Sequence, residues 1–162
     1  MDAIRVLLRQ HRAVEKLFQK FEEEDDVEAK QVICLEIGDA LAIHSTIEER
    51  LFYPATKDAR TEELQLEAVE GHLAAKRMLA ELAEEEDIDA AHLSARVKVL
   101  KELVAHQVRA EERDLFPLAK KVLDAHQLDR LGDELEDMSA ELKARGATHV
   151  QVPGEAGQPA SM

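Results

Sequence analysis

Apolar residues recur every three or four positions over five long stretches of this chain. The stretches cover residues 2–21, about 28–53, 61–83, about 89–123 and 125–144. In the first stretch the apolar positions are Ile4, Leu7, Leu8, Val14, Leu17, Phe18 and Phe21. Spacings of three, four and seven residues put side chains on one face of an α-helix. The pattern therefore predicts an all-α protein built from amphipathic helices.

Acidic runs and prolines divide these stretches. Residues 22–26 and 84–87 are almost entirely acidic, and we interpret both as solvated turns. Pro54 is expected to stop the second helix, because proline cannot continue a helix and restricts the residue before it. Pro117 is expected to bend the fourth helix or to end its first part.

The third and fourth helices repeat the first and second. The paired positions are His11 and His72, 61 residues apart; His44 and His106, 62 apart; and Glu48 and Glu111, like Pro54 and Pro117, 63 apart. Two helical hairpins related in this way close into an up-down four-helix bundle.

We therefore expect residues 1–123 to form a four-helix bundle, a size that suits one domain with a sizeable core. Residues 124–145 should add an accessory C-terminal helix, with an apolar stripe that includes Leu128 and Leu135. Residues 146–162 are rich in Gly, Pro, Ala and Ser, and we expect a disordered tail there.

The charge of the chain excludes some partners. Its formal net charge is −14, which repels nucleic acid and anionic membranes. No apolar run approaches the length of a membrane span, and the charged N-terminus does not resemble a signal peptide. The single Cys34 cannot form an internal disulfide, so we expect a cytoplasmic protein with Cys34 as an apolar core residue.

Two related motifs carry candidate metal ligands. They are HSTIEERLFYP, from His44 to Pro54, and HQVRAEERDLFP, from His106 to Pro117. His44 and Glu48 are four residues apart and point to the same spot, and imidazole with carboxylate suits iron, manganese or zinc. His106 and Glu111 are five residues apart and diverge by roughly 140°. Either the two side chains lie on opposite sides of the seam, the line along which neighbouring helices meet, or a local bulge in the helix brings them to the same face.

Four histidines and two glutamates fall on apolar faces at matching depths: His11, His44, His72, His106, Glu48 and Glu111. One such histidine is usually a core residue with a hydrogen-bond partner. Buried polar groups without partners cost about 1–3 kcal/mol each, so six together need compensation. A pair of cations bridged by the carboxylates and bound by neutral imidazoles supplies it.

The arrangement His11 … His44-x3-Glu48 … His72 … His106-x4-Glu111, with LFYP and LFP after the glutamates, resembles the hemerythrins and hemerythrin-like HHE domains over about residues 4–120. The resemblance implies an up-down bundle with two non-haem iron ions, bridged by carboxylates with or without an oxo or hydroxo group. It implies that His11 and His44 bind one iron, that His72 and His106 bind the other, and that Glu48 and Glu111 bridge them.

One position departs from the oxygen-carrying hemerythrins, which have a second histidine four residues after the one on the third helix. Lys76 stands there in this chain, and Glu15 stands four residues after His11. Glu15 either faces Lys76, supplies an additional metal ligand, or reaches solvent at the edge of the seam, as Lys76 then also does. Without that histidine both irons can keep an open position, which invites oxygen, peroxide or nitric oxide chemistry or iron loss.

Other polar residues near the motifs are expected to have structural roles. Glu49 and Glu112 should be solvated or pair with Arg50 or Arg113, and become ligands only if the register slips by one. Tyr53 should pack at a helix end. The remaining histidines, expected at the surface or at helix ends, are His92, His126 and His149, and the phenylalanines expected around the site are Phe18, Phe21, Phe52 and Phe116.

Three functions fit such a site. The first is binding or sensing of dioxygen or a related diatomic molecule, and we favour it. The second is an enzyme that handles peroxide or nitric oxide, and the third is iron storage or delivery. Each would need a reductant that the sequence does not identify. A ferritin-type ferroxidase is less favoured, because its carboxylates dominate, whereas histidines outnumber the bridging acids here.

Overall fold

The computed structural model describes residues 1–146, and the tail expected at 146–162 lies outside them apart from Gly146. The elements are α1 (Ala3–Glu23), α2 (Val27–Ile47), the π-helical turn η1 (Glu48–Phe52), α3 (Tyr53–Thr56), α4 (Glu62–Glu84), α5 (Ala90–Ala110), the π-helical turn η2 (Glu111–Leu115), α6 (Phe116–Val122) and α7 (Ala125–Ala144). Residues 1–146 contain no strand, so the predicted all-α class is confirmed. No helix in this part of the chain combines the length and the apolar content needed to cross a membrane.

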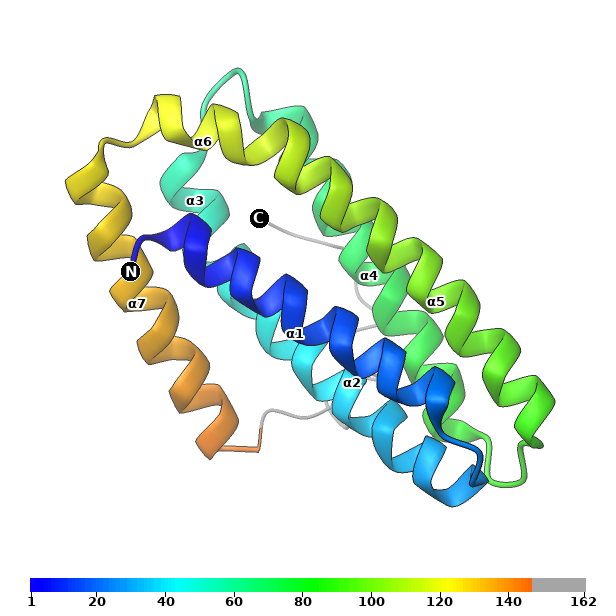
Figure 1. Cartoon of the computed structure of the whole chain (residues 1–162). Coiled ribbons are helices and arrows are strands. Elements are labelled where there is room, and N and C mark those ends of the chain that lie inside the picture. Colours follow the sequence, from blue (N-terminus) through cyan, green and yellow to red (C-terminus); the bar gives the residue numbers. More distant parts are fainter. Residues whose placement is uncertain (147–162) are drawn as a thin grey trace.

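The four long helices close into an up-down bundle (Figure 1). Helices α1 and α2 form one antiparallel hairpin, and α4 and α5 form the other. Contacts of α2 with α4 and of α1 with α5 complete the ring. This is the predicted four-helix bundle, and it directs one apolar face of each helix towards a common axis.

Helix α7 runs back along the bundle and packs against α1 and α2 (Figure 1). Its residues Leu128, Leu131 and Leu135 belong to the same buried cluster as Ile4 and Leu7 of α1. The C-terminal helix expected at 124–145 is therefore present, and it buries apolar residues of the first hairpin.

The sequence predicted that Pro54 would stop the second helix, and the structure shows that it does not. The chain stays helical through Thr56, and Pro54 is the second residue of α3, directly after η1. Pro117 has the same place in α6, directly after η2. In a π turn each N–H bonds five residues back, as Tyr53 N–H does to the Glu48 carbonyl. The wider turn makes room for a ring that lacks an N–H and would clash in an α-helix.

Gly132 is the point of closest approach between α7 and the start of α1. A Cβ atom at Gly132 would lie 2.0 Å from the backbone oxygen of Met1 and 2.9 Å from the backbone nitrogen of Ala3. Both neighbours are backbone atoms, so neither can rotate away.

We therefore expect Gly132→Ala to destabilise the protein by about 1–3 kcal/mol, because the new methyl group overpacks this contact. In a helix without this contact, a change from Gly to Ala would stabilise the protein by roughly 0.5–1 kcal/mol. The sign of the change in the free energy of unfolding therefore shows whether the contact is present. Urea unfolding measures the change, with the exposed neighbour Asp133→Ala as the control. A Gly132→Ala protein that is more stable than the original would contradict this packing.

Candidate metal centre

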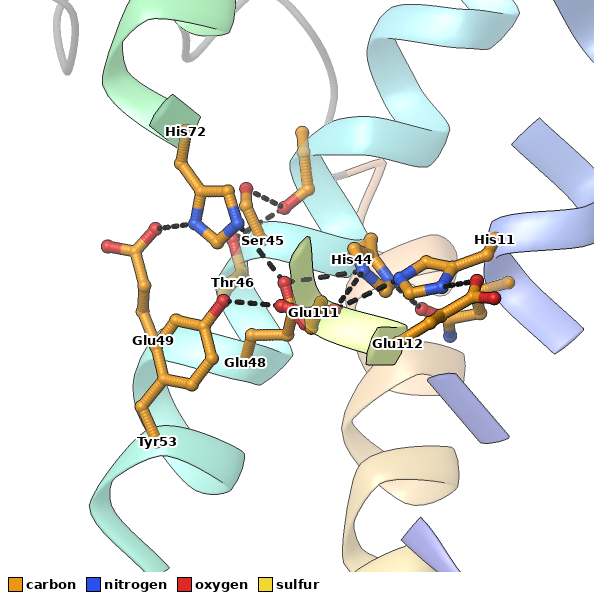
Figure 2. Close-up of polar contacts among 12 residues, drawn as sticks. His11, His44, Ser45, Thr46, Glu48, Glu49, Tyr53, His72, Glu111 and Glu112 are labelled. Carbon is orange, nitrogen blue, oxygen red and sulfur yellow. Dashed lines mark hydrogen bonds and ion pairs between the residues drawn. The ribbon is translucent and has the colours of Figure 1, made fainter. Parts of the chain in front are cut away.

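Three histidines and two glutamates converge inside the bundle, next to the two π turns (Figure 2). They are His11 of α1, His44 near the end of α2, Glu48 at the start of η1, His72 of α4, and Glu111 at the start of η2. No residue of this set is more than 9% exposed, and Glu48 is 0% exposed. The duplicated motifs thus place their two glutamates at equivalent positions, each opening a π turn.

The Nε2 atoms of the three rings face the carboxylates. Glu48 Oε1 lies 3.2 Å from Nε2 of His44 and 3.1 Å from Nε2 of His72. Glu111 Oε1 lies 3.0 Å from Nε2 of His11 and 3.9 Å from Nε2 of His44. One potential ligand atom from each of four residues (His11, His44, Glu48 and Glu111) lies within 4.8 Å of all the others.

The Nδ1 atoms of the same rings point away from the cluster, each towards an acceptor. The pairs are His11 with Glu112 at 2.8 Å, His44 with Gln10 at 2.8 Å, and His72 with Glu49 at 2.9 Å. A carboxylate or carbonyl oxygen can only accept, so each Nδ1 must carry the proton. This fixes the ring orientation and leaves Nε2 as the inward nitrogen, which is the arrangement found around protein-bound metals.

Glu49 and Glu112 therefore differ from the sequence-based expectation. Each bonds a histidine of the opposite hairpin, whereas a solvated position or a pair with Arg50 or Arg113 was expected. The physical reason is that a neighbouring helix brings a buried imidazole to a position that looks solvated on an isolated helix. The recurrence of two adjacent glutamates in both motifs was the available signal.

Tyr53 also contributes to the cluster, beyond the packing role expected for it. Its buried hydroxyl donates to Glu111 Oε2 at 2.8 Å, and its ring stacks on His72 with centroids 6.0 Å apart. Burial, together with the charges of Glu111 and Glu48, raises the Tyr53 pKa well above its ordinary value, so the phenol keeps its proton. Tyr53 thereby occupies one oxygen of Glu111 and leaves Oε1 facing His11 and His44.

His106 is not brought to the cluster. Its side chain is exposed, although it borders an outer cavity that His72 and Glu111 also line. The interval from His106 to Glu111 lies in regular α-helix, because the π turn begins only at Glu111. Five residues of α-helix turn the side chains of His106 and Glu111 roughly 140° apart. The π turn begins after this interval, so it cannot bring the two side chains to the same face. Gln107, four residues before Glu111, lines the cavity beside the cluster in place of His106.

Glu15 lies at the surface and bonds Arg12 on its own helix at 2.9 Å. An exposed position agrees with the arrangement in which Glu15 lies at the edge of the bundle. Lys76 is half-buried, borders the cavity beside the cluster, and interacts with another group.

The other histidines and the phenylalanines can be placed as well. His92 and His126 are exposed as expected, and His149 lies outside the described residues. Phe116 stacks on His11 with centroids 5.8 Å apart, and Phe52 contacts Phe116. Phe18 and Phe21 belong to a second buried cluster and do not line the cavity beside the site, so they differ from the expectation.

The carboxylates determine how the site is charged when no metal is bound. Burial disfavours the imidazolium of His44, but Glu48 and Glu111 outweigh it and raise the His44 pKa to about 10. Burial acts against His72 in the same way, and Glu48 and Glu49 raise its pKa to about 9. Burial also disfavours the Glu48 anion, yet His44, Glu111 and His72 hold the Glu48 pKa well below its ordinary value. Protons on two imidazoles thus neutralise the buried carboxylates.

The donor set fits metal ions. Neither oxygen of Glu48 receives a well-aligned hydrogen bond from the described residues, although the carboxylate is completely buried. Burial of the Glu48 anion is costly, and when the imidazoles are neutral a bound cation would offset that cost. Imidazole and carboxylate together suit iron, manganese and zinc. A metal ion would replace the imidazole protons, because a histidine binds metal only when Nε2 is deprotonated.

The free energy of unfolding of the metal-free protein should pass through a maximum between about pH 4.5 and 6.5. The raised pKa values of His44 and His72 stabilise the fold fully below pH 6.5, the ordinary value, and this stabilisation is lost as pH rises through about 9 and 10. The lowered pKa of Glu48 stabilises the fold above pH 4.5 and ceases to do so as pH falls. Urea unfolding of chelator-treated protein across this range measures the profile. A free energy that is constant from pH 6.5 to 10 would contradict the assignment.

Comparisons with known proteins show similarity over most of the chain. The family model described as Hemerythrin HHE cation binding domain matches residues 2–119. The crystal structure of a hemerythrin HHE cation binding domain-containing protein from Mycobacterium kansasii superposes with a TM-score of 0.80. It is 22% identical, and the match covers 91% of this chain and 90% of that one, which shows the fold alone. A search of curated proteins found no match. The matched residues include both hairpins and the whole cluster, and the chain belongs to the hemerythrin HHE cation-binding domain family.

Proposed function

We propose that this protein binds two iron ions in the cluster and that the iron centre binds or senses dioxygen or a related small molecule. The observation that carries the proposal is the opposed orientation of the two nitrogens in each of His11, His44 and His72. Outer acceptors hold Nδ1, while Nε2 faces two buried carboxylates. A purely apolar core does not require such an arrangement, whereas the binding of two cations by these imidazoles, with Glu48 and Glu111 between the cations, does.

The proposed ligands are unevenly divided between the two positions. His11 faces Glu111 Oε1, and its ring lies beside that of His44 with centroids 4.8 Å apart, so these two histidines favour one iron position. His44 Nε2 also faces both carboxylates, at 3.2 Å from Glu48 Oε1 and 3.9 Å from Glu111 Oε1. His72 lies near Glu48 Oε1 and favours the other. Since His106 is exposed and Gln107 faces the cavity, the second position has fewer imidazoles nearby in the described chain. Iron bound there would supply an open coordination position and redox capacity for a small ligand.

The cavity beside the cluster supports a ligand of this size. It has a volume of about 40 Å³, which is room for a few water-sized groups. Its walls beyond the cluster are mainly aliphatic, from residues that include Val14, Leu79 and Val104. Such a cavity favours a diatomic molecule or peroxide over a larger substrate.

We place the protein in the cytoplasm, with a reductant still to be identified. Burial raises the pKa of the Cys34 thiol to about 11, which keeps it protonated and unreactive. This fits a structural cysteine in a reducing compartment.

Elemental analysis should find about two iron atoms per chain after anaerobic reconstitution, and His72→Ala should lower that number. The matched control is His92→Ala, which removes an exposed imidazole and should keep the full content. The reduced iron-loaded protein should then change its absorption spectrum in air and recover it under argon. Steady peroxide breakdown in its place would favour an enzyme. Iron content unaffected by His72→Ala would refute the proposed ligand set.

His106→Ala separates the ligand set seen in the structure from the set implied by the family resemblance. We expect this variant to retain the iron content and the thermal stability of the original protein, because its ring is exposed. Arg109→Ala, at an exposed position of the same helix, serves as a comparison for general effects on α5. Loss of an iron atom in His106→Ala, and not in the comparison variant, would show that His106 is an iron ligand and would contradict the ligand set proposed here.

A further inference from the structure

Gln107 presents an amide group to the interior beside the proposed iron centre. It lies on α5, one helical turn before Glu111, and its side chain lines the cavity of about 40 Å³ next to the cluster. It also lines the outer cavity of about 90 Å³ that His106 and Ala68 border. His72 and Glu111 line that cavity too, so Gln107 stands between two cavities that both border the cluster.

The amide nitrogen of Gln107 is a donor without an acceptor. Nε2 is buried, and none of the described residues accepts a hydrogen bond from it. An unsatisfied buried donor generally costs a protein about 1–3 kcal/mol. Retaining this donor against a small, mostly aliphatic cavity suggests that its acceptor is a molecule that enters the cavity.

Gly71 on α4 makes room for this amide. A Cβ atom at position 71 would lie 2.0 Å from Gln107 Nε2 and 2.8 Å from its Cδ. The missing side chain at Gly71 thus creates the space that the amide group fills, one residue before His72. The packing of α4 against α5 holds the donor in place.

We propose that Gln107 donates a hydrogen bond to the small ligand of the metal centre and so sets the affinity of the centre for anionic ligands. This inference rests on the proposed iron site. A donor in a site of low dielectric constant interacts more strongly with a negatively charged ligand than the same donor in water. The amide does not titrate, so it offers this donor at every pH at which the protein is folded.

Lys76 is another donor that borders the same cavity, and it is the one with a formal positive charge. It is half-buried and interacts with another group in the structure. The experiment therefore includes Lys76→Met, so that the contributions of the two side chains can be told apart.

The test measures azide binding to the iron-loaded protein, with the iron content of every variant determined first. Gln107→Met keeps the length of the side chain and removes the donor. Gly71→Ala leaves Gln107 intact and displaces its amide, which ends a flexible side chain and can move. The matched control is Gln19→Met, an exposed glutamine on α1.

Titration of the azide absorption band should show binding weakened about tenfold or more in Gln107→Met and in Gly71→Ala, the loss expected for one hydrogen bond to a charged group. Gln19→Met should match the original protein, and iron content should stay constant throughout. Unchanged azide affinity in Gln107→Met, or weakening in Lys76→Met alone, would overturn the inference. Loss of iron in Gln107→Met would overturn it too, since Gln107 would then support the metal. Absence of iron from the original protein would instead refute the iron site itself.

Discussion

Two carboxylates buried between three imidazoles impose the constraint that the rest of this fold must satisfy. Glu48 is fully enclosed, and Glu111 nearly so, in the middle of a helical bundle. Such anions are tolerated only when positive charge lies beside them. Protons on His44 and His72 can supply it, since the pKa values of both rings are raised. Metal cations would replace those protons and supply the same compensation.

The local features of the chain serve that cluster. Each π turn begins at one of the buried glutamates, and the proline that follows fits the widened turn. The glutamate pair of each hairpin reaches histidines of the other hairpin, so the contacts across the bundle are reciprocal. Tyr53 fixes the outer oxygen of Glu111. The bundle therefore holds the candidate ligands in place without a metal ion, which would reduce the ordering cost of binding one.

The sequence predicted the helices and most of the cluster, because both depend on spacing within one helix. Apolar periodicity located the bundle, and the His44-x3-Glu48 interval is read directly as one helical turn. Contacts between helices were harder: the bonds of Glu49 and Glu112 to histidines depend on how two hairpins are docked, which no local pattern encodes. The structure places Gln107 beside the cluster where the sequence predicted His106, which is a shift of one residue along α5. It depends on where the π turn starts, and single-sequence periodicity does not resolve that point.

Anomalous diffraction at the iron edge from crystals of the reconstituted protein would locate the metal ions among these side chains. We expect two iron peaks, one beside His11 and His44 and one beside His72, with Glu48 and Glu111 between them. Iron bound only elsewhere, or five unchanged side chains with no peak among them, would contradict this expectation.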